Sequence, residues 1–184
     1  MSDLSKAALI VIDVQQGFDE PYWGERNNLQ TEANIARLLD AWRRAGRPVF
    51  HVKHNSRLPR SPLHPSKAGN AFKDFAEPKE DELSFGKEVN SAFIGTGLEQ
   101  ALRDESIGDV VIVGLTTPHC VSTSTRMASN LGFKTTVVSD ATAAHAGSGP
   151  DGKPIDAETM HYHALAALNG EFATIVATAD LLDA

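Results

Sequence analysis

The sequence predicts a three-layer α/β/α fold, in which helices cover both faces of a parallel sheet. Short runs rich in Val and Ile, without polar alternation, are typical of strands that are buried on both faces. Segments with apolar residues at helical spacing separate these runs. Strands that alternate with helices of about 10 to 15 residues indicate a parallel sheet with right-handed crossovers. The predicted strands are residues 7–13, 48–53, 109–115, 135–139 and 173–177.

Four helices are predicted in this pattern. The first has apolar residues at helical spacing over residues 35–42 and ends at Gly46. The second begins at Thr96, because Glu99 follows it at the spacing of a capping box. Two more helices are predicted at residues 119–131 and 156–170, each next to a glycine that ends it.

The composition is that of one ordinary globular domain, which we place at residues 1–184. The chain is 41% hydrophobic, which excludes a disordered protein, and its net charge of −7 argues against a nucleic-acid partner. No apolar run approaches the roughly 20 residues that cross a bilayer, so no membrane partner is expected. The N-terminus lacks the pattern of a secretory leader, and we expect a cytoplasmic protein.

Residues 54–82 do not fit the alternation of strands and helices. This segment holds four prolines and few apolar residues, and it is longer than an ordinary connection. Structureless segments beyond about 12 to 15 residues are usually lids, binding loops or disordered regions. The segment is therefore either a lid or wall of a pocket, or a surface excursion that contacts another subunit.

Three polar side chains are candidates for chemistry, because ligands of an open parallel sheet bind outside the carboxyl ends of its strands. Asp13 closes the first predicted strand, and Lys87 lies in a short strand candidate at residues 85–93. Cys120, the only cysteine, stands where the third predicted helix starts, and a helix N-terminus favours the thiolate. The bland alternatives are a buried small side chain for Cys120, an N-cap or ion-pair partner for Asp13 and a surface lysine for Lys87.

A metal is the competing use of this edge, because His51 and His54 lie close together in the sequence. On a strand these two positions face opposite sides of the sheet, and no carboxylate stands between them to complete a ligand set. A single cysteine also excludes a thiolate-rich metal site or a disulfide framework. The sequence therefore predicts no metal and no other cofactor.

Three ordered motifs resemble those of the isochorismatase-like cysteine hydrolases, a superfamily that includes nicotinamidases and N-carbamoylsarcosine amidase. They are IDVQ at residues 12–15, Lys87 five residues before Ala92, and GLTTPHCVSTSTR at residues 114–126 followed by SDA at 139–141. The resemblance implies a Rossmann-like sheet of about six parallel strands and a catalytic triad of Asp13, Lys87 and Cys120. It also implies a cis peptide between Leu115 and Thr116, with the backbone N–H groups of Thr116 and Cys120 as an oxyanion hole.

The function that this resemblance implies is hydrolysis of a small amide through a thioester, without a cofactor. Nicotinamidases carry a metal-binding Asp-x-His where this chain has His54-Asn55-Ser56, which disfavours a metal-dependent member. Isochorismatases that cleave a vinyl ether lack the cysteine that is present here. An ether or ester hydrolase, and a catalytically silent or redox-sensing member of the fold, remain as alternatives.

The substrate is expected to be small and to lie in a pocket at this edge of the sheet. Family members commonly form homodimers or homotetramers, so a homo-oligomer is expected. The predicted substrate-binding residues, aromatic or able to hold polar groups, are Gln15, Phe18, Trp23, Asn90, Phe93 and His119.

Overall fold

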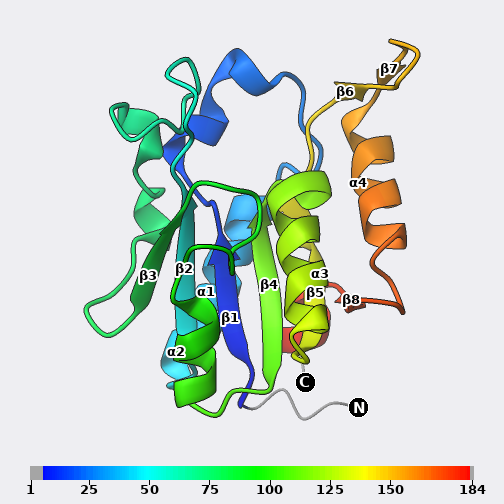
Figure 1. Cartoon of the computed structure of the whole chain (residues 1–184). Helices are drawn as coiled ribbons and strands as arrows, with labels where there is room; N and C mark the ends of the chain where they lie inside the picture. The colour runs from blue at the N-terminus through cyan, green and yellow to red at the C-terminus, as the bar shows by residue number, and fades with distance from the viewer. Residues whose placement is uncertain (1–5, 183–184) are drawn as a thin grey trace.

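The computed structural model, which describes residues 6–182, contains a six-stranded parallel sheet between two layers of helices (Figure 1). The strand order is β3-β2-β1-β4-β5-β8, so the chain starts near the centre of the sheet and builds outward in both directions. The three-layer prediction is confirmed. The strands are β1 (Ala8–Ile12), β2 (Val49–His54), β3 (Leu83–Lys87), β4 (Asp109–Leu115), β5 (Lys134–Ala143) and β8 (Thr174–Val176).

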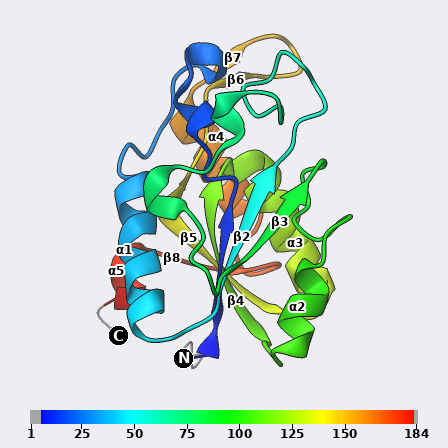
Figure 2. The same ribbon diagram turned by 90° about the vertical axis from the view of Figure 1, so that its left-hand side faces the viewer.

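Each face of the sheet packs against its own pair of helices (Figure 2). On one face, α1 (Thr31–Arg44) and α5 (Thr178–Leu182) cover alternate residues of β1 such as Leu9. On the other, α2 (Leu98–Asp104) and α3 (Ser122–Asn130) cover the intervening residues such as Ile10. Because both faces of β1 are covered, all five of its residues are buried, which is why its sequence shows no polar alternation.

Two helix predictions need correction. The capping box at Thr96 is wrong: α2 begins at Leu98, the hydroxyl of Thr96 accepts a hydrogen bond from the Leu98 N–H, and Glu99 pairs with Arg103 instead. The helix predicted at residues 119–131 begins with a π-helical turn, η6 (Thr117–Val121), and continues as the α-helix α3. The last predicted helix is confirmed as α4 (Ala157–Ala166), which is capped by Asp156 but ends earlier than expected.

Gly114 allows the carboxyl ends of β1 and β4 to approach closely. Its φ is +122°, and a Cβ atom at this position would lie 1.9 Å from the carbonyl oxygen of Ile12. A side chain is therefore excluded on steric grounds as well as by the backbone conformation. The close approach brings the residue after β1 and the turn after β4 to the same edge of the sheet.

The segment at residues 54–82 is packed against this edge. It contains two short 3₁₀ turns, η4 (Ala68–Asn70) and η5 (Asp74–Ala76), and Phe72 forms a β-bridge with Gln15. Other short 3₁₀ turns, η2 (Gln16–Asp19) and η3 (Pro21–Trp23), follow β1, and a small hairpin of β6 (Gly147–Ser148) and β7 (Pro154–Ile155) follows β5. Within the described residues, no helix has the length and apolar content that a membrane span requires.

Candidate active site

The fold brings Asp13, Lys87 and Cys120 together from three separate segments. Asp13 directly follows β1, Lys87 is the last residue of β3, and Cys120 lies in η6 after β4. The Nζ atom of Lys87 donates hydrogen bonds to Asp13 Oδ2 at 2.7 Å and to Cys120 Sγ at 3.2 Å. The side chains of Asp13 and Lys87 have no exposed surface, so this ion pair is fully buried. The carboxylate, the ammonium and the thiol form one contiguous cluster.

His54 is a fourth member of this cluster. It is the last residue of β2, lies opposite Lys87 in the β2–β3 register, and its Nδ1 atom is 2.9 Å from Lys87 Nζ. One donor atom each from Asp13, His54 and Cys120 lie within 4.8 Å of one another, a spacing at which three such atoms could bind a metal ion. They do not fit an open metal site, because the Lys87 ammonium is within hydrogen-bonding distance of all three residues.

The electrostatics of Cys120 differ from the sequence prediction. The helix N-terminus was expected to favour the thiolate, but burial, together with the negative charge of Asp13, raises the pKa of the Cys120 thiol well above its usual range. The nearby Lys87 ammonium offsets this effect only in part. The thiol is therefore protonated in the resting site and requires a proton acceptor.

Asp13 offers such an acceptor. Its Oδ2 atom is occupied by Lys87, whereas its Oδ1 atom is buried and has no hydrogen-bond partner among the described residues. A buried carboxylate oxygen without a partner is unfavourable, because it has lost water and gained nothing in exchange. The thiol of Cys120, whose sulfur lies within 4.8 Å of an oxygen of this carboxylate, is a neighbouring group that can supply a proton to it.

The turn before Cys120 has an unusual backbone. The peptide bond between Leu115 and Thr116 is cis. The carbonyl oxygen of Thr116 accepts hydrogen bonds from the N–H groups of His119, at 3.1 Å, and Val121, at 3.2 Å, and the second of these closes the π-helical turn. Thr116 and Cys120 therefore stand at either end of one tightly bonded loop that borders the site.

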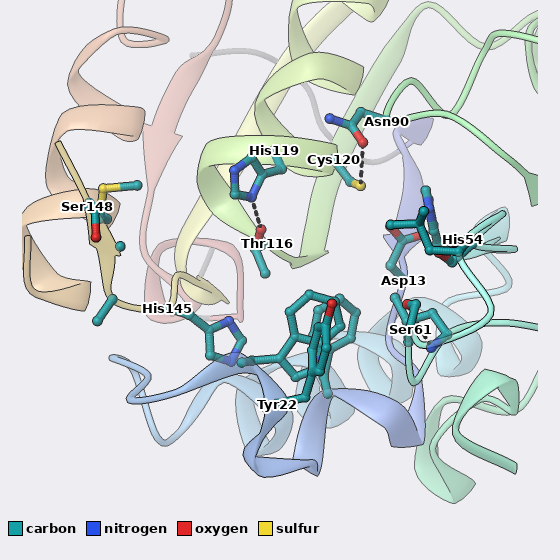
Figure 3. Close-up of a pocket in the computed structure, with 18 residues that line it drawn as sticks. Asp13, Tyr22, His54, Ser61, Asn90, Thr116, His119, Cys120, His145 and Ser148 are labelled. Carbon is teal, nitrogen blue, oxygen red and sulfur yellow. Dashed lines mark hydrogen bonds between the residues drawn. The ribbon is translucent and has the colours of Figure 1, made fainter. Parts of the chain in front are cut away.

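A cavity of about 480 Å³ opens onto Asp13 and Cys120 (Figure 3). One wall is aromatic: Phe18 stacks on Trp23 with ring centroids 4.9 Å apart, and Tyr22 meets Trp23 edge to face. Asn90 and His119 lie near the thiol. The cavity is within the size range of sites for small molecules. Most of the surface that lines it is apolar, as is usual for such sites.

Four of the predicted substrate-binding residues, Phe18, Trp23, Asn90 and His119, line this cavity, and two do not. Gln15 is fully buried behind it, where its amide donates to the backbone carbonyl groups of His54 and Asn70. Phe93 packs in the core against Phe133. The prediction that Gln15 and Phe93 line the pocket is therefore wrong: both side chains are used in holding the fold together.

Two further segments contribute to the cavity wall. Residues within 56–63 line the cavity, which supports the pocket-wall interpretation of the long segment at 54–82. Residues 145–148 after β5 also line it, and sequence reasoning missed them. The rule that functional residues follow the carboxyl ends of strands could have found His145, but β5 was predicted to end at Ser139 and extends to Ala143.

His145 completes the aromatic wall as a neutral imidazole. Its ring lies 6.1 Å from that of Phe18 and 6.0 Å from that of Trp23. Burial lowers its pKa to about 4, and the nearby charge of Arg26 acts in the same direction. At neutral pH this end of the cavity therefore carries no charge on the imidazole.

Comparisons with known proteins agree with this geometry. The chain matches the model of the isochorismatase domain family over residues 7–180. It is 49% identical to the uncharacterized isochorismatase family protein YrdC of Bacillus subtilis, over 97% of this chain and 95% of the relative. It is 31% identical to Nicotinamidase 3 of Arabidopsis thaliana, over 74% of this chain and 73% of that protein.

Solved structures give the same result. The chain superposes on an isochorismatase-family protein from Chromobacterium violaceum with a TM-score of 0.94 at 39% identity, covering 99% of this chain and 94% of that one. An isochorismatase from Pseudomonas putida superposes with a TM-score of 0.88 at 33% identity, covering 97% and 91% of the two chains. The match of the family model over nearly the whole chain and these relatives show that the chain belongs to the isochorismatase family of hydrolases.

Proposed function

We propose that this protein hydrolyses a small amide through a thioester intermediate on Cys120. The observation that carries the proposal is the unequal use of the two Asp13 oxygens: Lys87 occupies Oδ2, Oδ1 is buried and has no partner among the described residues, and an oxygen of this carboxylate lies within 4.8 Å of the thiol sulfur. A nucleophile with a raised pKa needs a base within reach, and this geometry supplies one. The relative that is named a nicotinamidase supports an amide as the substrate.

The reaction begins when Asp13 Oδ1 accepts the thiol proton of Cys120 and the Lys87 ammonium stabilises the thiolate. The sulfur attacks the amide carbonyl carbon, and the carbonyl oxygen becomes negative. The N–H groups of Thr116 and Cys120 are proposed to bind this oxygen. Asp13 then returns its proton to the nitrogen, the C–N bond breaks, and ammonia or an amine leaves.

Hydrolysis of the thioester regenerates the enzyme. A water molecule gives its proton to Asp13 and attacks the thioester carbonyl, the C–S bond breaks, and the sulfur recovers a proton from Asp13. The acid product then leaves the cavity.

The cavity indicates which amides fit. Among the described residues that line it, Asp13 is the only acidic side chain and none is Lys or Arg. The Lys87 ammonium is nearby, but its side chain has no exposed surface and does not line the cavity. A carboxylate on the substrate would find no cation to pair with and would lie close to Asp13. We therefore propose an uncharged substrate with a flat group that stacks on the wall formed by Phe18 and Trp23.

The redox-sensing alternative fits this site less well. Cysteine oxidation favours exposed thiols with a large thiolate fraction. Cys120 is buried, and its pKa is raised, so both requirements are unmet in the resting protein. A thiol that becomes nucleophilic only when Asp13 removes its proton is suited to catalysis at the wall of a cavity.

The test is ammonia release from a panel of small amides that contains nicotinamide, carbamoyl amines, ureides and dicarboxylic monoamides. Wild type and Cys120→Ala are assayed side by side, with circular dichroism as the check that the variant is folded. We expect release by the wild type and none above background by the variant. Hydrolysis at the wild-type rate by folded Cys120→Ala would overturn the proposal.

A further inference from the structure

We propose that His54 has two separate tasks in this site. Its Nδ1 atom holds the Lys87 ammonium in place, and its Nε2–H group donates a hydrogen bond to a second acceptor atom of the substrate. The first task depends only on the geometry of the cluster, and the second rests on the proposed function. The contacts of Lys87, the backbone around His54 and the face that its ring presents to the cavity lead to this assignment.

The contacts of Lys87 fix the hydrogen-bonding state of His54. A lysine ammonium has three protons and no acceptor site. Lys87 Nζ has three partners: Asp13 Oδ2 at 2.7 Å, His54 Nδ1 at 2.9 Å and Cys120 Sγ at 3.2 Å. All three protons are therefore in use, and Nδ1 must accept one of them with its lone pair. A neutral imidazole that accepts at Nδ1 carries its own proton at Nε2.

The backbone of His54 is held on both sides. Its N–H donates to Gln15 Oε1 at 2.8 Å, and its carbonyl oxygen accepts from Gln15 Nε2 and Asn70 Nδ2, both at 3.1 Å. The N–H of Asn55 donates to the Lys87 carbonyl oxygen at 2.7 Å, which continues the β2–β3 ladder. These bonds explain the buried position of Gln15. They also fix the point from which the imidazole extends toward Lys87.

His54 also belongs to the wall of the cavity. His54 lines the cavity next to Asp13 (Figure 3). Its contact with a described side chain is made through Nδ1, which leaves the Nε2–H free to donate to a ligand. Burial and the adjacent Lys87 lower the pKa of His54, while Asp13 opposes this, so the ring is neutral at pH 7. The imidazole of His54 is therefore a fixed, uncharged donor close to the thiol. It suits an amide with a carbonyl oxygen or ring nitrogen near the reacting carbon.

Two substitutions separate the two tasks. In His54→Asn, the Oδ1 atom can take the place of Nδ1 and accept from Lys87, but the distal donor is lost. In His54→Gln, the terminal NH₂ can take the place of the Nε2–H donor, but the acceptor for Lys87 is lost. His163→Asn, which changes an exposed histidine of α4, is the matched control and should keep both kinetic constants.

The expected results for the two variants are opposite. For an amide with a second acceptor, His54→Asn should raise KM about tenfold and leave kcat within about threefold, because a binding interaction is lost. His54→Gln should lower kcat about tenfold or more and leave KM nearly unchanged. For an amide without a second acceptor, His54→Asn should behave like the wild type. If both variants change kcat and KM in the same way, or neither changes them, the assignment is wrong.

A second measurement does not need turnover. Alkylation of Cys120 by iodoacetamide, followed by intact mass, reports how well Lys87 stabilises the thiolate. His54→Gln should slow alkylation about threefold or more, and His54→Asn should stay within about twofold of the wild type. Equal rates in all variants would overturn the role of Nδ1. If the wild type hydrolyses no amide, the proposed function fails, yet alkylation still decides whether His54 positions Lys87.

Discussion

Two buried clusters in this protein are built from the same kinds of side chain, but only one of them is suited to catalysis. Each contains a histidine of β2, a carboxylate and a cation. In the first, His51 and Arg43 bind Glu82, and in the second, His54 and Asp13 bind Lys87. The composition of a cluster therefore does not identify an active site.

The difference lies in how far the carboxylate is satisfied. Glu82 accepts hydrogen bonds from Arg43 at 2.7 and 2.8 Å, from His51 at 2.8 Å and from the backbone N–H of Lys79 at 3.0 Å, so both of its oxygens are in use. Asp13 keeps one oxygen without a partner among the described residues, and its carboxylate lies close to a thiol and beside a cavity. An unfilled acceptor beside a thiol distinguishes the proposed catalytic cluster from the one at Glu82.

The strongest way to break this comparison is to remove the charge of Asp13. Asp13→Asn removes the base that takes the thiol proton, and kcat/KM for ammonia release should fall about a thousandfold. Circular dichroism checks that the variant is folded. Cys120→Ala is the matched variant for comparison, because it removes the nucleophile but leaves the ion pair of Asp13 and Lys87 intact. Retention of activity within tenfold would show that Asp13 is not the base.

The corresponding change in the other cluster should affect stability instead of turnover. Glu82→Gln weakens the charged hydrogen bonds to Arg43 and His51 and should lower the free energy of unfolding by about 1.5 to 3 kcal/mol. Urea denaturation measures this change. Turnover by the folded variant should remain within twofold of the wild type, and a large loss of kcat would mean that this cluster also contributes to catalysis.

The pH dependence of stability sharpens the same contrast. Burial alone would raise the pKa of Glu82, but the hydrogen bonds from Arg43, the Lys79 N–H and His51 lower it to about 2. A carboxyl whose pKa is lowered on folding stabilises the native state above its unfolded value of 4.5, and this contribution is lost as the pH falls toward about 2. The stability difference between wild type and Glu82→Gln should therefore be full at pH 6 and shrink progressively below pH 4.5. A difference that stays constant down to pH 2.5 would contradict the assigned contacts.

The two clusters also differ in how exposed the cation is to a ligand, and the effect expected on kcat/KM is smaller. The side chain of Arg43 is 16% exposed, whereas that of Lys87 has no exposed surface, so a ligand in the cavity cannot pair with the cation of the catalytic cluster. Between two amides of similar size, we expect the neutral one to have a kcat/KM about tenfold higher than an anionic one. A preference for the anionic amide would require a cation that the described residues do not place at the cavity.

The sequence predicted most of the sheet and the elements that carry Asp13, Lys87 and Cys120, because strands buried on both faces leave uninterrupted runs of Val and Ile. Lys87 was harder to place. The run at residues 85–93 is a strand only as far as Lys87, where β3 ends. The small β6–β7 hairpin and α5 were missed, because they are too short to show a period.

The walls of the cavity were less predictable than the cluster of Asp13, Lys87 and Cys120. Gln15 and Phe93 are near the site in the sequence but do not line the cavity. Gln15 hydrogen-bonds to the backbone of His54, and Phe93 packs against Phe133 in the core. The contact between His54 and Lys87 depends on the register of two parallel strands that are joined by a long segment. No local pattern encodes such a register, so the neighbours of Lys87 could be found only from the fold.

The most direct test of the central claim is whether an acyl group is carried by Cys120. An amide that the wild type hydrolyses is turned over in the presence of hydroxylamine, in parallel with the ester of the same acid, and the hydroxamate and the free acid are quantified. A shared thioester predicts hydroxamate from both substrates in the same ratio to the acid, with neither product formed by Cys120→Ala. Formation of the acid alone, or ratios that depend on the leaving group, would contradict a common acyl-enzyme intermediate.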